Sequence, residues 1–397
     1  MLNLSLLYFF YFSLFGVLFP YLGRFLKHHG YGFETIGFVM AVLTGVNIFA
    51  PFLVARISDI TGNRLALTRN ICFLLLLSTA LLYPAWGLWY TVFIVGAIGM
   101  SLSMMLPQLE AFSLAFLGND QHKYGSIRMW GSFGFVITVW LFGWSMNWLS
   151  IDWFRYFQVI IVLCLLVTIL FLLWREPAES TQTVTEVASS SGLERLKTPA
   201  VAIMFLVMLL NQAALAPYNT FGDLYFQQAG FSTGEIGFLL AVAPTSEVIL
   251  LALMPLLLSR FGYFSLLVLS LVLGVVRWWF TAHLGDQLVW VAVLQLTHSF
   301  TFGAMHVLAI YLVGKLFPPN QQGIGQSLYV SLVSGAGLVI GNLVAGQFWQ
   351  NGTGAQQVFL AGMVICLISV VLTCWFVRPS QVKAAQAAGS VSTAKSD

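Results

Sequence analysis

The sequence predicts an all-α integral membrane protein whose twelve transmembrane helices form two pseudo-symmetric six-helix bundles. Three observations predict this fold. Of the 397 residues, 59% are hydrophobic and only 8% are charged, whereas a soluble globular protein carries roughly 25% charged residues. The apolar segments have the length of bilayer-spanning helices. The two halves of the chain also resemble each other at a constant offset.

The apolar segments fall six and six around one long polar stretch. Each is close to the roughly 20 apolar residues that cross a bilayer, and the first, Leu2 to Leu22, is predicted to be a retained helix because it lacks a basic n-region and a cleavage site. The predicted spans are 4–23, 36–57, 68–86, 89–116, 127–148, 154–174, 200–226, 236–258, 263–283, 288–314, 323–348 and 355–377. We therefore expect an N-terminal bundle 1–174, a cytoplasmic linker 175–198, a C-terminal bundle 199–378 and a disordered cytoplasmic tail 379–397.

The basic residues are distributed unevenly between the two sides of this topology. On the side opposite both termini lie only Arg24, Lys27 and Arg155. The side that carries both termini holds Arg56, Arg64, Arg69, Lys123, Arg175, Arg195, Lys197, Arg260, Lys315, Arg378, Lys383 and Lys395. The positive-inside rule then predicts a multi-pass protein of the bacterial cytoplasmic (inner) membrane with both termini in the cytoplasm.

An internal repeat relates the two halves. Residues 30–42 align with residues 230–242 at an offset of 200, with identical glycine, isoleucine, phenylalanine, alanine and valine positions. The same offset pairs Gly62 with Gly262 in the loop after each half's second span. A parallel duplication of six helices is typical of transporters whose halves rock about a site near the bilayer midplane.

The loop after the second span carries a recognisable motif. Asp59, Gly62 and Arg64 match the pattern G-x-x-x-D-R-x-G-x-R, whereas Ala55 and Ile60 depart from it. This loop resembles the cytoplasmic signature of the major facilitator superfamily. The resemblance implies a cytoplasmic gate, in which the acid and the arginine join neighbouring helices and Gly62 permits the turn.

Ionisable residues inside the spans indicate a function, because each costs several kcal/mol unless it is paired or hydrated. Asp223, near the outer end of the seventh span, is expected to contact water. The other ionisable residues inside the spans include one acid and one arginine in each half, Glu110 with Arg128 and Glu247 with Arg277. The second half also contains His298 and His306. These pairs are either structural or belong to a substrate or proton site, and buried pairs contribute little stability alone.

The segment containing Glu110 and Arg128 resembles helices 4 and 5 of the proton-coupled lactose permease. That resemblance implies that Glu110 and Arg128 bind substrate and that Phe135, seven positions after the arginine, stacks on it, although the family has tryptophan there. In the second half Glu247, Arg277 and His298 match the family's acid, arginine and histidine. The family's carboxylate three residues after the histidine is Thr301 here.

The chain resembles the 3-phenylpropionate permease (MFS_1-like) branch of the superfamily more closely. The resemblance rests on the segments 124–132, 247–249, 275–278 and 294–298, with His306 eight residues after His298. It implies import of aromatic carboxylates with protons. Trp130 and Phe135 are then candidates to stack on the substrate ring, beside Glu110 and Arg128.

The function predicted from these residues is proton-coupled symport of a small organic solute by alternating access, with an aromatic carboxylate such as 3-phenylpropionate as the first candidate. A desolvated carboxylate can hold a proton and release it when an arginine approaches. Glu247 with Arg277 is predicted to do this, assisted by His298 or His306. The alternatives are a sugar, oligosaccharide or nucleoside:proton symporter, an uncoupled facilitator and a drug-exporting antiporter.

The sequence argues against other classes of function. The net charge of +3 gives no field for nucleic acid, and the four cysteines lie singly in apolar runs. His298 and His306 are too far apart for a zinc-binding helix, and neither GxSxG nor GxxxxGK[ST] occurs, which disfavours an intramembrane enzyme. We expect no metal and no cofactor besides the coupled proton, and a monomer whose partners are its substrate, protons and the lipid bilayer.

Overall fold

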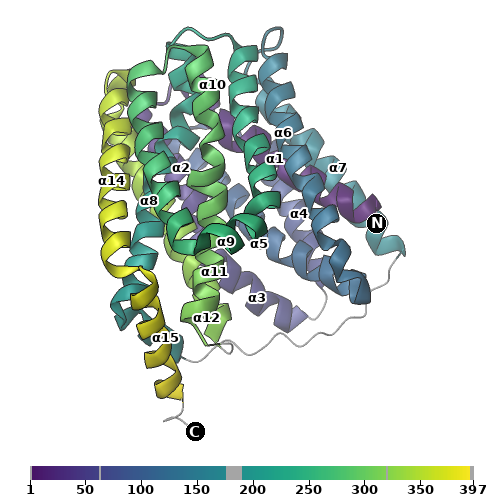
Figure 1. Ribbon diagram of the computed structural model, residues 1–397. Coiled ribbons are helices and arrows are strands. Elements are labelled where there is room, and N and C mark those ends of the chain that lie inside the picture. Colours follow the sequence, from purple (N-terminus) through teal and green to yellow (C-terminus); the bar gives the residue numbers. More distant parts are fainter. Residues whose placement is uncertain (1, 62–63, 176–189, 319–320, 394–397) are drawn as a thin grey trace.

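The computed structural model describes residues 2–61, 64–175, 190–318 and 321–393. The chain folds into two helical bundles that stand side by side, the N-terminal one in purple and blue and the C-terminal one in green and yellow (Figure 1). The fold is all-helical over this part of the chain, as the sequence predicts.

The N-terminal bundle contains the first six spans. Its helices are α1 (Leu2–His28), α2 (Phe33–Gly45), η1 (Val46–Ile48), α3 (Ala50–Thr61), α4 (Arg64–Ala80), η2 (Pro84–Trp86), α5 (Leu88–Leu117), η3 (Gly118–Lys123), α6 (Tyr124–Ser145) and α7 (Trp153–Arg175). The predicted span 36–57 is broken, because α2 and α3 meet at an angle of 43°. We call the side on which α1 ends the distal face and the opposite side, where the chain starts, the terminal face.

The C-terminal bundle follows a short helical turn after the linker. It consists of η4 (Ser190–Lys197), α8 (Pro199–Gln228), α9 (Thr233–Leu284), α10 (Leu288–Leu296), η5 (Ser299–Ala304), α11 (Met305–Leu316), α12 (Gln322–Leu328), η7 (Tyr329–Gly337), α13 (Leu338–Phe348), η8 (Gln350–Gly352), α14 (Ala355–Phe376) and α15 (Pro379–Thr393). The segments η5 and η7 are π-helical and interrupt two of the spans. Such segments are frequent at functional sites.

The helices account for twelve crossings. Within the described residues, nine helices are long and apolar enough to span a membrane, and the bent pair formed by α2 and α3 makes a tenth. The shorter apolar helix 66–80 is an eleventh. Helix α9 counts twice, because 52 residues extend about 78 Å, more than twice the roughly 30 Å hydrocarbon core. Its two spans meet at Gly262, whose φ of 72° departs from helical geometry.

The internal repeat is visible in the backbone. Gly30 and Gly230, which end the first helix of each half, have φ of 87° and 92°. After each glycine the chain closes the helix in the same way: Tyr31 N donates to Leu26 O, and Phe231 N donates to Phe226 O, both at 3.1 Å. Only glycine adopts such a φ without strain, so the repeated glycines preserve one helix end in both halves.

Small residues let the two halves approach closely near the distal face. A Cβ on Gly37 of α2 would lie 2.7 Å from Gly346 Cα of α13, and one on Gly237 of α9 would lie 3.0 Å from Gly143 Cα of α6. Gly37 and Gly237 are equivalent positions of the repeat. The halves therefore cross twice, at positions related by the duplication, and each crossing needs a glycine on both helices.

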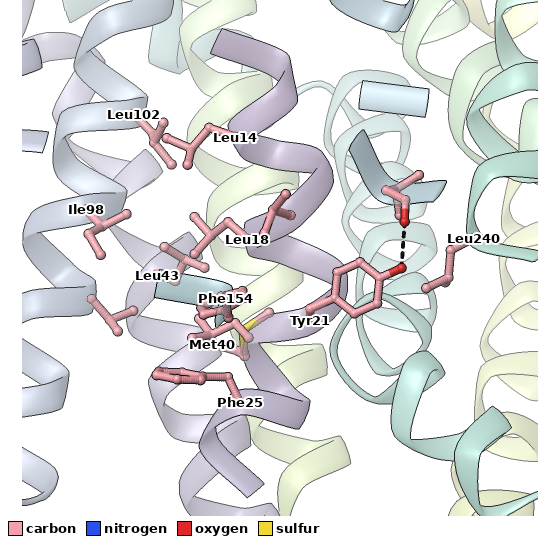
Figure 2. Packing of buried hydrophobic residues seen from close by; sticks show 14 of the residues in the cluster. Leu14, Leu18, Tyr21, Phe25, Met40, Leu43, Ile98, Leu102, Phe154 and Leu240 are labelled. Atoms are coloured by element: carbon pink, nitrogen blue, oxygen red, sulfur yellow. Dashed lines mark hydrogen bonds between the residues drawn. The ribbon is translucent and has the colours of Figure 1, made fainter. Parts of the chain in front are cut away.

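One hydrophobic cluster continues across the halves on the distal side. It includes Leu22, Phe25 and Ile36 of the first half together with Phe221 and Trp349 of the second. Figure 2 shows its centre, where Tyr21 of α1 donates to Val139 O at 2.7 Å and Leu240 of α9 lies beside the ring.

The second half has a separate cluster nearer the terminal face, built from residues such as Met204, Leu267, Leu308 and Leu316. The hydrophobic contact between the halves is therefore concentrated on the distal side. The two bundles are therefore in close contact at the distal face and less so at the terminal face.

A buried ion pair joins the halves at the distal face. Arg24 Nε of α1 lies 2.5 Å from Asp223 Oδ2 of α8, and the two residues are 6% and 2% exposed. The sequence-based expectation that Asp223 contacts water is wrong. The reason is that α1 and α8 are equivalent helices of the repeat and pack against each other, so that their ends exclude solvent together.

The tail also differs from the prediction. Residues 379–393 form α15 instead of a disordered segment, and its Val382 and Ala385 are buried. Arg195 of η4 donates to Leu316 O and, at 3.2 Å, to Ala385 O. Apolar residues at a helical spacing of three allow this helix to pack at the foot of the second half (Figure 1). Most of the predicted linker, residues 176–189, lies outside the described residues.

Candidate functional site

Glu110 and Arg128 face each other near the terminal side of the first half. Arg128 Nε of α6 lies 3.8 Å from Glu110 Oε1 of α5. This distance is too long for a hydrogen bond, so the two groups attract each other without being locked together. Their side chains are 31% and 39% exposed. The predicted pair is present, and both groups remain accessible to a further partner.

Aromatic side chains of α1 surround the Arg128 guanidinium. Its centre lies 4.1 Å from the ring centroid of Phe12 and 5.5 Å from that of Tyr8. A Cβ on Gly131 would come 2.5 Å from the Phe12 ring, so the glycine one turn after Arg128 allows α1 to approach. The guanidinium is thus held between a carboxylate and two aromatic faces, which orients it without satisfying its five donors.

The two predicted stacking residues lie on different faces of α6. Phe135 follows Arg128 by two helical turns and therefore shares its face, where the partly buried ring packs against the core. Trp130 is two residues from Arg128, about 200° around the helix, and its ring packs on Phe133 at 5.9 Å. The structure keeps Phe135 as a candidate and does not bring Trp130 to the guanidinium.

The arginine of the second half is enclosed by polar and aromatic groups. Arg277 is 1% exposed. Its Nη1 donates to Thr301 Oγ1 at 2.9 Å and lies 3.1 Å from His298 Nδ1. Its guanidinium lies 4.7 Å from the Tyr218 ring centroid and 4.6 Å from that of Trp278. Arg277 and His298, two of the predicted proton-coupling residues, therefore lie side by side.

Glu247 does not pair with Arg277 in this structure, contrary to the pairing that the sequence suggested. Both side chains are described and no ion pair joins them. The reason is depth in the membrane. Glu247 lies 14 residues after the distal start of α9, about 21 Å, whereas Arg277 lies 7 residues before its distal end, about 10 Å.

The cation that acts on Glu247 is Arg128 of the other half. Arg128 lies 17 residues before the distal end of α6, about 26 Å, so it is nearer in depth to Glu247, at about 21 Å, than Arg277 is. The Glu247 side chain packs against Gly303, where a Cβ would come 2.8 Å from Glu247 Cγ. The π-helical segment η5 thus provides the space that the carboxylate occupies.

His306 lies at a depth close to that of Arg128. It follows the distal start of α10 by 18 residues, about 27 Å, and it too interacts electrostatically with Arg128. Its Nδ1 lies 2.9 Å from the Tyr329 hydroxyl of η7. Arg128 is therefore the common neighbour of an acid in its own half and of two titratable groups in the opposite half.

The sequence reasoning missed several residues of these clusters. Tyr218 donates to Gln295 Oε1 at 2.8 Å beside Arg277, and Asn211 donates to Thr301 O at 2.8 Å. Tyrosine and asparagine in the middle of apolar spans give a weak signal, because single polar residues are common there. The internal repeat could have indicated the Arg24–Asp223 pair more clearly. The repeat offset of 200 relates Arg24 to Leu224, the residue next to Asp223.

The predicted cytoplasmic gate lies outside the described part of the chain. Gly62 is not described, and the side chains of Asp59 and Arg64 are not described either. The backbone shows that α3 ends at Thr61 and that α4 begins at Arg64. The gate therefore stays a prediction.

The chain has the multi-pass fold of the major facilitator transporters. A crystal structure of a mutant of the nucleoside transporter NupG matches it with a TM-score of 0.84 at 20% identity, over 94% of this chain and 98% of that chain. The family model described as "MFS_1 like family" matches residues 1–361, and the chain belongs to this family.

Curated relatives match nearly the whole chain. The "Probable 3-phenylpropionic acid transporter" of Escherichia coli (strain K12) is 28% identical over 96% of this chain and 97% of its own length. The "Maltose permease" of Geobacillus stearothermophilus is 27% identical over 92% of each. These relatives are membrane transporters, so the chain is a secondary transporter of small molecules and not an enzyme.

Proposed function

We propose that this transporter imports a small organic solute together with a proton, and that the solute is an aromatic carboxylate such as 3-phenylpropionate. The single observation that carries the proposal is the position of Arg128. It is held loosely by Glu110 at 3.8 Å, lies against Phe12, and interacts electrostatically with Glu247 and His306 of the other half. A planar guanidinium with free donors is suited to bind a carboxylate bidentately.

The same geometry provides a means of coupling the solute to a proton. A buried carboxyl group prefers its neutral form unless a cation is close. A solute carboxylate bound to Arg128 compensates the positive charge that otherwise favours ionised Glu247. Glu247 then takes up a proton when the solute binds and releases it when the solute leaves. Solute and proton therefore travel in the same direction, and neither travels alone.

Arg277 has a different role in this proposal. It lies about 10 Å nearer the distal face than Glu247, among His298, Thr301 and Tyr218. One of its donors, Nη2, has no hydrogen-bond partner among the described residues. Arg277 and His298 thus form a second polar layer that a proton or the solute meets on the distal side of Glu247.

With both termini in the cytoplasm of a bacterial inner membrane, the distal face is the outer face. The unequal basic residues support this orientation. The structure is then closed to the outside, and the accessible pair of Glu110 and Arg128 lies nearer the cytoplasm.

Sugar:proton symport is the second candidate function. The similarity to the maltose permease, 27%, is close to that of the 3-phenylpropionic acid transporter, 28%. The half-buried Glu110 beside Arg128 is also an arrangement that can bind sugar hydroxyls. The two candidates differ in what Arg128 holds, a charged carboxylate or a neutral hydroxyl.

The test is uptake into proteoliposomes with and without an inside-alkaline pH gradient. We expect radiolabelled 3-phenylpropionate to accumulate only with the gradient and a protonophore to abolish accumulation. Unlabelled maltose and uridine serve as competitors. Competition by maltose without transport of 3-phenylpropionate would replace the first candidate by the second, and gradient-independent equilibration would exclude proton coupling.

A further inference from the structure

A cavity opens at the distal face between the two halves. It has a volume of about 340 Å³ and is bounded by the ends of α1 and α8, the start of α9 and the connection from α6 to α7. Such a volume is sufficient for a small organic molecule. Phe12, beside Arg128, and Arg24, in the cavity wall, are 12 residues apart on α1, about 18 Å. The cavity is therefore distinct from the site around Arg128.

The charged residues of the cavity wall are all basic. Arg24, Lys27 and His28 of α1 line it, and none of its described lining residues is acidic. Neutral polar groups are supplied by Gln227 and Thr233 of the second half. The distal side of the protein has only three Lys or Arg residues, and two of them line this one cavity. Arg24 is paired with Asp223, and His28 Nε2 lies 3.6 Å from Asp152 Oδ1. Among the described residues, Lys27 is therefore the lining cation that can attract an anion without a nearby carboxylate of its own.

The rest of the wall is apolar. Met146, Leu149 and Ile151 contribute from the connection between α6 and α7, and Leu224 contributes from α8. An inorganic anion makes no use of such a surface, whereas an organic anion with a hydrocarbon body does. A cation at one end and an apolar wall at the other are the usual features of a site for a small carboxylate.

Arg24, which lines this cavity, has one donor without a partner. Its Nε binds Asp223, but its Nη2 has no hydrogen-bond partner among the described residues. The residue is 6% exposed, so bulk water does not replace the missing partner. A buried donor without a partner is destabilising. The positive charge of Arg24 in the cavity wall attracts a carboxylate.

We propose that this cavity is a binding site for a small organic carboxylate on the distal face, held by Arg24 and Lys27 against the apolar wall formed by the α6–α7 connection. The site does not require that the bound anion be the transported solute.

The test is ¹⁹F NMR of 4-fluorobenzoate with the purified full-length protein in nanodiscs. Binding is measured in Arg128→Gln, which removes the guanidinium of the central site, and in the same background with Lys27→Gln. The matched control is Lys197→Gln, a lysine of the terminal face that pairs with Glu194 at 3.2 Å. We expect the Arg128→Gln protein to retain a binding site for 4-fluorobenzoate. Adding Lys27→Gln should lower the affinity of that site about tenfold, because one charge-assisted contact is lost. Adding Lys197→Gln should leave the affinity unchanged.

Three outcomes of this binding measurement would overturn the inference, and a fourth comes from a lipid comparison. The first is that Arg128→Gln shows no residual binding of 4-fluorobenzoate. The second is that Lys27→Gln leaves the residual affinity unaltered, and the third is that Lys197→Gln lowers that affinity as much as Lys27→Gln does. A further comparison uses nanodiscs with and without phosphatidylglycerol. If the anionic lipid displaces 4-fluorobenzoate completely, the cavity binds lipid headgroups and the proposal is wrong. Failure of solute transport in the unsubstituted protein leaves this measurement unaffected, so the two proposals can fail separately.

Discussion

Arg128 is the residue through which the proposed solute and proton sites communicate. Its side chain is 31% exposed, it is oriented by Phe12 and Tyr8, and it is not locked to Glu110. It also acts on Glu247 and His306 of the other half. A point charge cannot replace its planar fork of donors, because lysine lacks the bidentate geometry.

We expect Arg128→Lys to weaken binding of 3-phenylpropionate by about a hundredfold while the protein stays folded. Binding is measured by calorimetry and folding by the thermal unfolding temperature in detergent. Arg155→Lys is the matched control, since Arg155 also lies over aromatic rings but at the distal face. Normal affinity in Arg128→Lys removes Arg128 from the binding site.

We expect Glu247→Gln to keep substrate binding and counterflow exchange but to lose accumulation driven by a pH gradient. The amide imitates a carboxyl group that is permanently protonated, and exchange requires no net proton movement. The assay is uptake into proteoliposomes, with Glu34→Gln at the exposed start of α2 as the control. Uphill, proton-driven uptake by Glu247→Gln would assign the proton to another group, and His306 or His298 would be tested next.

At the scale of single elements, the two interrupted spans and the glycine crossings determine what the helices can do. The π-helical segment η5 carries Thr301, which binds Arg277, and Gly303, which accommodates Glu247. On the distal side, Gly237 allows α9 to lie against α6. These are positions where backbones or buried charges come close, and larger side chains cannot be accommodated without movement.

We expect Gly237→Val to open the distal side. A Cβ on residue 237 would lie only 3.0 Å from Gly143 Cα, so the valine side chain cannot fit between α9 and α6. Opening is measured as the rate at which a membrane-impermeant maleimide labels Thr220→Cys, a position buried where α8 meets the first half. Gly314→Val is the control, since a Cβ at that helical glycine meets no atom within 4 Å. Equal labelling of the two valine variants contradicts a role for the crossing in closure.

At the scale of the whole molecule, the halves are held together at one end. Duplicated helix crossings, a continuous apolar cluster and the Arg24–Asp223 pair all lie on the distal side. Near the terminal face the second half has its own cluster. The alternating-access movement that we propose must separate all three distal contacts, and the ion pair is the one that a single charge change can disrupt.

We expect Asp223→Asn to favour the distally open state by about 3 kcal/mol, because it leaves the Arg24 guanidinium buried without a counter-ion. Labelling of Thr220→Cys should accelerate accordingly. The double variant Arg24→Gln with Asp223→Asn should return the rate toward that of Thr220→Cys alone, since neutral partners carry no buried charge. Unchanged labelling in Asp223→Asn would show that the apolar contacts alone keep the distal side closed.

The fold and most helix positions could be predicted from the sequence, because length and hydropathy alone specify which segments cross a bilayer. The repeat of Gly30 and Gly230 likewise predicted two equivalent halves, and the backbone ends both first helices in the same way. The tail was predicted wrongly because its few apolar residues become stabilising only when a partner surface exists, and that surface is formed by distant segments.

The sequence by itself determined which ionisable groups lie inside the membrane, since any charge within an apolar span is conspicuous. Only the tertiary structure decided their partners. Glu247 and Arg277 belong to consecutive spans but differ in depth by about 10 Å, whereas Glu247 and Arg128 belong to opposite halves and differ in depth by about 5 Å. Pairing depends on how far each residue lies along its own helix and on how the bundles face each other, and neither is written in the local pattern of apolar residues.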